Sequence, residues 1–230
     1  MAVLILGSKP DPTFPRRAES VVYANGAVMH SEALRERFGP IREVHVLSNS
    51  LLSDRNALCG ETRALMMGAR MDETFLISFR PESEVAHSLE EIDYEAKVLH
   101  RWSRPAKEKV TRDVLGPGML RRVLGARYPM ANKVTFLRHY VRTRELHVST
   151  GVLALLVAIH QRMPGPYVIA GIGMEDSGYS YSARAALRGH QINDAAAFSA
   201  LASGGSTGEV FTTEPELSRA VGLPLWSDES

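Results

Sequence analysis

The sequence is poor in cysteine and has no long apolar run. Its 230 residues include one cysteine, Cys59, so no internal disulfide can form. The longest apolar run, residues 152–159, is far shorter than the roughly 20 residues that a membrane span needs, so we expect no transmembrane segment. The apolar start, residues 2–6, is too short for a signal peptide and lacks a basic leader. These absences predict a protein of a reducing cytoplasm.

An excess of one charge is also missing. Lys and Arg number 27 and Asp and Glu 26, which gives a formal net charge of +1, and no segment runs to five like charges. No overall field would therefore attract nucleic acid or membrane, and a polyanion would need a local patch. We expect no nucleic-acid partner. A composition with 44% hydrophobic and 23% charged residues excludes a disordered or fibrous chain.

Several common site motifs are absent. The first apolar run is followed by GSKPDP, which lacks the glycines of the dinucleotide fingerprint, so NAD and FAD are not expected. There is no Walker loop, no His-x-x-x-His and no paired-cysteine spacing, so we expect neither a metal nor another cofactor. A Gly-x-Ser-x-Gly nucleophile elbow is missing as well, which removes the main support for hydrolase chemistry of that type.

What is present is an alternation of short apolar runs and segments of helical spacing. The fold class predicted from it is α/β, with a mostly parallel Rossmann-like sheet covered by helices on both faces and a small lid segment. The wholly apolar first run predicts a strand near the sheet centre. Strands are expected at 2–6, 20–24, 43–47, 74–79, 167–172 and 209–213, and helices at 30–38, 61–69, 151–162, 194–202 and from Pro215.

Residues 81–144 give a weaker pattern. Prolines punctuate the segment, and helical spacing is clear only at 110–124, around a Gly-Pro-Gly break, so we expect irregular helices there. The predicted organisation is one nucleotide-binding α/β domain formed by residues 1–173 and 191–230. Residues 174–190, rich in Gly, Ser and Tyr, are expected to form the short lid.

Small polar residues follow several of the predicted strands. In a parallel sheet the ligand crevice lies beyond the carboxyl ends of the strands, where glycines permit close approach and amides and hydroxyls can bind a nucleotide. For any one such loop taken by itself, an ordinary turn is the better explanation. These residues are Gly7, Ser8 and Lys9 after the first strand, Asn25 after the second, Asn49 after the third, and Gly171 and Ile172 at the end of the strand at 167–172.

Ser149, Thr150 and Gly151 open a predicted helix. Free N–H groups, a hydroxyl and the positive helix end suit a phosphate, although an ordinary N-cap has the same sequence. Tyr179 and Tyr181 could donate phenolic hydrogen bonds from the lid, and His190 could accept a proton from a sugar hydroxyl.

The C-terminal part resembles a known family. The segments VSTGVLALLVAIHQRMPGPYVIAGIGMEDSGYSYS, RGHQIND and EVFTTEPELSRAVGLP are similar in order and spacing to bacterial lipooligosaccharide sialyltransferases, which use CMP-sialic acid and have a Rossmann-type variant of the GT-A fold. The N-terminal half resembles the family more faintly, through the turns after its first three strands. The resemblance implies a CMP-sugar donor, a glycan or glycolipid acceptor, and a cytoplasmic location, either free or peripheral at the inner face of the membrane.

The resemblance also implies roles for residues. His190 would deprotonate the acceptor and Tyr181 would hydrogen-bond the phosphate, so these two are the expected catalytic residues. The implied reaction is inverting transfer without a metal. The residues implied to bind the nucleotide are Gly7, Ser8, Lys9, Asn25, Asn49, Ser149, Thr150, Gly151, Gly171, Ile172, Glu175 and Tyr179.

Departures from the family pattern leave alternatives open. Gly173 stands where the family has an aspartate, Glu175 where it has a lid tyrosine, and His147 where it has an arginine. A related sugar acid such as Kdo could be the donor sugar, and a nucleotide-binding or scaffold protein of the same fold without transfer activity is the main alternative. A transferase using S-adenosylmethionine is disfavoured because Asn25, not an acid, closes the second strand. The acceptor, the linkage and the oligomeric state, a homo-oligomer included, stay open.

Overall fold

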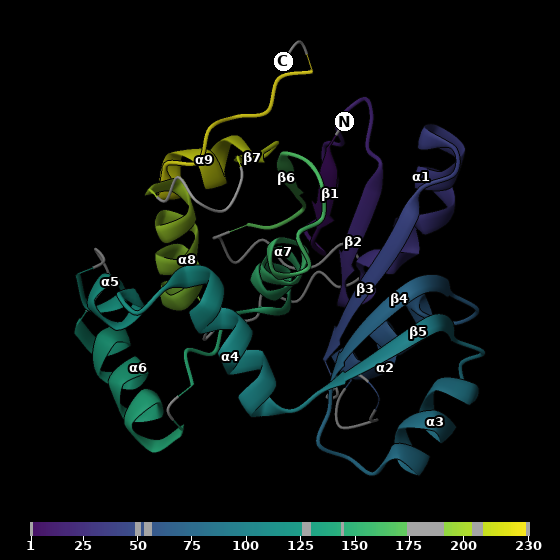
Figure 1. Cartoon of the computed structure of the whole chain (residues 1–230), viewed down its shortest axis with the longest axis horizontal. Coiled ribbons are helices and arrows are strands. Elements are labelled where there is room, and N and C mark those ends of the chain that lie inside the picture. Colours follow the sequence, from purple (N-terminus) through teal and green to yellow (C-terminus); the bar gives the residue numbers. More distant parts are fainter. Residues whose placement is uncertain are drawn as a thin grey trace.

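A parallel sheet, to which the described residues contribute seven strands, forms the centre of the molecule (Figure 1). The computed structural model describes residues 2–48, 52, 57–125, 130–143, 145–173, 191–203 and 209–228. Each neighbouring pair in the sheet is parallel. The predicted α/β class is therefore confirmed. In spatial order the strands are β5 (Glu95–Trp102), β4 (Arg70–Ile77), β3 (Arg42–Ser48), β2 (Ser20–Ala24), β1 (Val3–Leu6), β6 (Tyr167–Ala170) and β7 (Val210–Thr212).

The strand order reverses once, between β1 and β6. From β1 the chain adds β2, β3, β4 and β5 in turn on one side, and it then returns to place β6 and β7 on the other side of β1. A crevice opens at the carboxyl ends of the strands at such a switch point, because the loops on its two sides leave in opposite directions. The prediction that the first strand lies inside the sheet is confirmed, since β1 pairs with both β2 and β6.

Alternate residues of β1 belong to different halves of the core, because successive side chains of a strand point to opposite faces. Val3 and Ile5 pack in one cluster with the residues of α7. Leu4 and Leu6 belong to a second cluster that includes Leu34 of α1. Helices thus cover both faces: α1 (Ser31–Phe38), α2 (Ala57–Leu65) and α3 (Glu82–Glu90) one face, and α4 (Arg104–Leu115), α7 (Thr150–His160) and α8 (Gln191–Ser203) the other.

Helix α7 is apolar on all sides, and its surroundings explain why. It lies against β1, β2 and β3 on one side and against α4 and α8 on the other, so residues 152–159 are all buried. Ser149 is the N-cap, and its side chain accepts a hydrogen bond from the Val152 N–H. The remaining helices of the described residues are η1 (Asn25–His30), where the sequence suggested only a turn, α5 (Met119–Gly125), α6 (Met130–Thr143) and α9 (Pro215–Val221).

The expectation of irregular helices at 81–144 is wrong in part. The segment contains the regular helix α3 and a complete strand, β5, as well as α4, α5 and α6. The strand was missed because β5 is an edge strand with a mostly exposed or half-buried sequence, EAKVLHRW, that lacks a continuous apolar run. The Gly-Pro-Gly break is confirmed, because α4 ends at Leu115 and α5 begins at Met119. The predicted lid, residues 174–190, lies outside the described residues.

Candidate functional site

The loops after β1 and β6 meet at the switch point. A Cβ at Gly7 would lie 2.4 Å from the Gly171 carbonyl oxygen, and one at Gly171 would lie 2.7 Å from the Gly7 oxygen. Gly171 also has a φ of +64°. The Gly7 N–H donates to Ala170 and the Lys9 N–H donates to Gly171. Close backbone packing thus explains both glycines.

Lys9 links these loops to the end of β7. Its ammonium lies 3.1 Å from the Glu214 carboxylate and 3.2 Å from that of Glu216. Glu214 is buried, and its other oxygen accepts the Gly171 N–H at 2.9 Å. Burial lowers the pKa of Lys9, but the two carboxylates outweigh it and raise the pKa above its ordinary value. The lysine is therefore charged and already paired at the predicted nucleotide site.

Asn25 is positioned by contacts with β3. Its φ is +51°, a left-handed conformation that asparagine tolerates. Its side-chain oxygen accepts the Ser48 N–H at 3.3 Å, and its main-chain oxygen accepts a hydrogen bond from His45 at 2.8 Å. The Ser8 hydroxyl donates to Ala24 at 3.3 Å and so joins the β1 loop to the end of β2. The structure thus brings the predicted residues of the first two loops together.

The N-terminus of α7 lies beside the switch point. A Cβ at Gly151 would lie 3.0 Å from the Ile172 side chain, so the first turn of α7 contacts the loop after β6. Within the described ranges, neither the Thr150 N–H nor the Gly151 N–H has an acceptor. The Ser149 N–H does have one, because it donates to the Asp194 carboxylate at 2.8 Å. The N-terminus of α7 therefore has the groups to bind an anion, but the Asp194 carboxylate already lies beside it.

The sequence analysis did not identify two charged residues of α4, Glu108 and Lys107, although α4 packs against α7. Glu108 of α4 is buried and accepts the Leu146 N–H at 3.0 Å, while its other carboxylate oxygen has no partner among the residues described. Burial raises the pKa of Glu108, despite the Leu146 N–H, and lowers the pKa of its neighbour Lys107 against the opposing attraction of Glu108, Glu145 and Asp194. The sequence gave no sign that Glu108 and Lys107 are buried, since adjacent charged residues on a helix are usually solvated.

A cavity of about 730 Å³ lies at the opposite, amino edge of the sheet, near the starts of β3, β4 and β5. Its charged groups are largely in ion pairs with one another. Arg35 pairs with Glu43 at 2.5 Å, and Lys97 pairs with Asp72 at 2.7 Å. Glu43 also accepts the buried Tyr23 hydroxyl at 2.8 Å. The charged residues that line the cavity thus neutralise one another and leave no excess charge for a ligand.

Five of the predicted site residues lie outside the described part of the chain. They are the two expected catalytic residues, His190 and Tyr181, and three expected nucleotide ligands, Asn49, Glu175 and Tyr179. The other nine predicted residues, Gly7, Ser8, Lys9, Asn25, Ser149, Thr150, Gly151, Gly171 and Ile172, lie in contiguous segments along the carboxyl edge.

No group of three or more His, Cys, Asp or Glu within the described residues could hold a metal ion. In the same part of the chain, no helix is long and apolar enough to cross a bilayer. The class of protein that the structure defines is a Rossmann-like α/β protein. Comparisons with family models, with curated proteins and with solved structures find no match.

Proposed function

We propose that this chain is a metal-independent inverting glycosyltransferase that moves sialic acid, or a related sugar acid such as Kdo, from a CMP donor to a glycan or glycolipid acceptor. One observation carries the proposal: the first turn of α7, with the Thr150 and Gly151 N–H groups, lies against Ile172 at the switch point of a parallel sheet. A helix N-terminus at a switch point suits the phosphate of a nucleotide. The resemblance of the C-terminal segments to sialyltransferases supports CMP as that nucleotide.

The transfer reaction requires the protein to position the two substrates and to stabilise the charge that develops. As CMP leaves, negative charge grows on its phosphate, and the partial positive charge of the α7 N-terminus would stabilise it. Tyr181 would add a phenolic hydrogen bond, and His190 would take the proton of the acceptor hydroxyl as it attacks. These two roles rest on the sequence, because both residues lie outside the described ranges.

Ligand binding is the first test. A thermal-shift titration with CMP, CDP, UDP, NAD and S-adenosylmethionine should show stabilisation by CMP, which at 100 times its Kd would add about 2.7 kcal/mol. Stabilisation by another of these ligands, or by none, would overturn the proposal. A donor screen with CMP-sialic acid and CMP-Kdo then measures hydrolysis and transfer.

Two variants of Asn25 separate chemistry from conformation. Asn25→Ala removes the amide and strains the backbone, because φ is +51° there. Asn25→Gly removes the same amide and tolerates that φ. Both should lose CMP binding if the amide contacts the nucleotide, whereas retained binding in Asn25→Gly would show a conformational effect only.

His190→Ala tests the assigned base. It should abolish transfer and leave CMP affinity unchanged, because the imidazole would act on the acceptor and not on the donor. Retained turnover would remove His190 from the mechanism.

A second function is favoured by one observation. The Asp194 carboxylate already accepts the Ser149 N–H at the N-cap of α7, and its charge opposes a phosphate there. A carboxylate at this position is compatible with a nucleotide-binding or scaffold protein of the same fold without transfer activity. It would show no donor hydrolysis even at high protein concentration, and it would bind a nucleotide weakly or not at all.

A further inference from the structure

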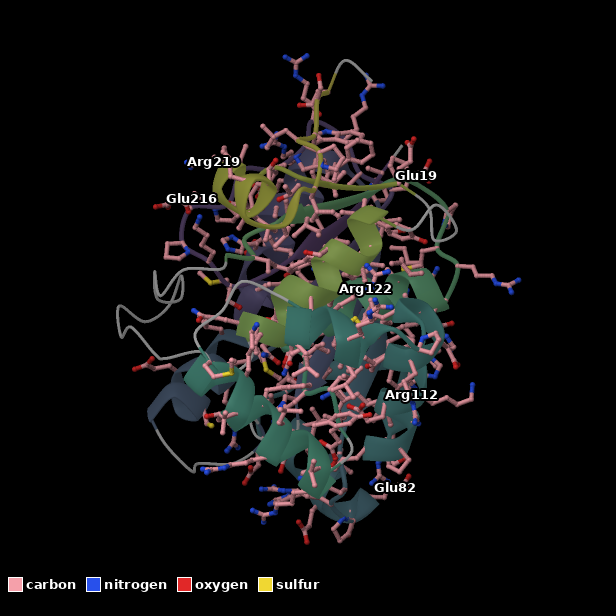
Figure 2. The ribbon with its side chains drawn as sticks, turned by 90° about the vertical axis from the view of Figure 1, so that its left-hand side faces the viewer. Glu19, Glu82, Arg112, Arg122, Glu216 and Arg219 are labelled. Carbon is pink, nitrogen blue, oxygen red and sulfur yellow. The ribbon has the colours of Figure 1, made fainter. Side chains whose placement is uncertain are left out.

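Helices α5 and α6 form a layer on the outer side of α4 and α8, remote from the sheet (Figure 1). Figure 2 views the molecule from this side and labels Arg122 on α5. The inner side of α6 is anchored to the core: Phe136 is 4% exposed, and Tyr140 stacks on it. The Lys133 ammonium donates to the Leu124 carbonyl at 2.8 Å and ties α6 to α5. The layer is therefore held in place with its other side facing solvent.

That outer side carries large apolar side chains. Met130 is 71% exposed, Val141 is 64% exposed and Val134 is 39% exposed. Their spacing of four and seven residues puts them on one stripe of α6, because a helix makes a turn every 3.6 residues. Leu124 at the end of α5 is exposed as well. A stripe of exposed apolar side chains on an anchored surface helix is typical of a binding surface.

Basic side chains border the stripe. Arg138 and Arg142 lie on one flank of α6 and Lys133 on the other, by the same helical spacing. Arg121 and Arg122 on α5 are also exposed. Among the described residues, no carboxylate pairs with any of these five, although most other exposed cations of the fold, such as Arg42 and Lys97, have acidic partners.

The local sequence offers these cations no acidic partner. Between residues 114 and 144 there is no Asp or Glu, while seven residues are Lys or Arg, in a chain whose net charge is only +1. Two of the seven, Arg127 and Arg144, lie outside the described residues. The five described cations thus lie, without acidic residues in the same segment, on the two helices that expose the apolar stripe.

We propose that the outer side of α5 and α6 binds the surface of a membrane that contains anionic lipid. The apolar stripe would enter the boundary between headgroups and acyl chains, and the flanking cations would contact the phosphates, as in interfacial amphipathic helices. Nucleic acid fits less well, because it offers no apolar layer for Met130, Val134 and Val141. This inference does not depend on the proposed transferase activity.

The surface lies close to the candidate site. The imidazole of His139, on α6, lies 4.9 Å, centroid to centroid, from that of His147, in the segment that leads into the N-terminus of α7. A chain bound to lipid through α6 would therefore hold the carboxyl edge of its sheet near the membrane surface.

Flotation of the full chain with lipid vesicles tests the proposal. We expect the protein to float with vesicles of phosphatidylcholine and phosphatidylglycerol in low salt, to bind less in high salt, and not to float with phosphatidylcholine alone. Arg138→Gln with Arg142→Gln should weaken binding roughly thirtyfold, because each cation near an anionic surface contributes about fivefold. Met130→Ser combined with Val141→Ser should also weaken vesicle binding. This loss of binding should appear in high salt as well as in low salt.

Matched controls lie elsewhere on the surface. Met67→Ser removes an apolar side chain that is 65% exposed, and Arg219→Gln removes an exposed cation from α9. Both should float like the parent chain. All substituted side chains are exposed, and circular dichroism and thermal melting check that each variant folds.

Three outcomes would overturn the proposal. The first is no flotation with anionic vesicles in low salt. The second is equal loss in the control and α6 variants. The third is a dimer by light scattering that the α6 variants dissociate, with no vesicle binding, because the stripe would then pair two copies of this chain.

Discussion

The imidazole of His45 lies 2.8 Å from the main-chain oxygen of Asn25, and this contact fixes both the proton on the ring and the end of β2. A carbonyl oxygen can only accept, so the Nε2 of His45 carries the proton and its Nδ1 accepts from the Tyr94 hydroxyl at 2.8 Å. The Tyr94 oxygen in turn accepts from Thr74 at 2.6 Å. A buried chain of hydrogen bonds thus joins Thr74 of β4, through Tyr94 and His45, to Asn25 at the carboxyl edge of the sheet.

Acid should weaken the fold through His45. Burial lowers the pKa of His45 to about 4, despite the bond to Asn25, whereas the unfolded chain has the ordinary value near 6.5. The unfolded state therefore binds more protons between these pH values. The free energy of unfolding should fall by about 3 kcal/mol as the pH drops from 6.5 to 4. Urea unfolding across this range measures it.

A difference between variants isolates His45, because burial also lowers the pKa of His30 and acts in the same direction. His45→Gln keeps a donor for Asn25 and an acceptor for Tyr94 but cannot titrate. This variant should lose most of the pH dependence. His87→Gln, on the exposed surface of α3, controls for the removal of a histidine. An unchanged slope in His45→Gln would contradict the prediction.

Gly171→Ala should destabilise the protein more than Gly222→Ala. Both glycines have a positive φ, +64° and +78°, so each alanine meets a conformational cost of about 1 kcal/mol. At Gly222 no atom of the described residues, apart from those of its chain neighbours, lies within 4 Å of the new Cβ, whereas at Gly171 the Gly7 oxygen lies at 2.7 Å. We expect Gly171→Ala to cost roughly 1–3 kcal/mol beyond the control. Equal losses in urea unfolding would show that the two loops can separate freely.

The sheet could be predicted where burial leaves a simple pattern. Strands β1, β2 and β6 are buried on both faces, so each is a mostly apolar run that is followed by a glycine or an asparagine. Strand β5 has one side against β4 and the other open, and its alternating charged residues hide it. Helix α4 begins at Arg104, before the predicted start, because Pro105 fits the first turn of a helix and does not break it.

The candidate site was predictable only as loop positions. Gly7 and Gly171 could be named from the ends of apolar runs, but their mutual contact depends on the strand order, which the sequence does not encode locally. The partners of Lys9 were not foreseeable for the same reason, since Glu214 is distant in sequence. Glu108 and Lys107 gained their perturbed pKa values only from the packing of α4 beside α7.

Lys9 and Glu214 should be coupled in stability. Among the described residues, Lys9→Met leaves the buried Glu214 carboxylate with only the Gly171 N–H, and it should cost about 1–2 kcal/mol in urea unfolding. Glu214→Gln keeps an oxygen for Gly171, so the double variant should be less destabilised than the sum of the single ones. Glu216→Gln, at an exposed partner of Lys9, should change stability by less than about 1 kcal/mol. Additive effects of Lys9→Met and Glu214→Gln would show that the ion pair contributes nothing.

Asp194→Asn should strengthen nucleotide binding at α7. The asparagine oxygen can still accept the Ser149 N–H, which the carboxylate now accepts at 2.8 Å, so the helix end stays capped while its negative neighbour disappears. A phosphate at the Thr150 and Gly151 N–H groups would then meet less repulsion, and we expect CMP to bind several-fold more tightly by isothermal titration calorimetry. Asp113→Asn, on the exposed side of α4, is the matched control and should leave the affinity unchanged. Weaker CMP binding in Asp194→Asn would mean that this carboxylate contacts the nucleoside and does not compete with its phosphate, which would move the phosphate away from the α7 N-terminus.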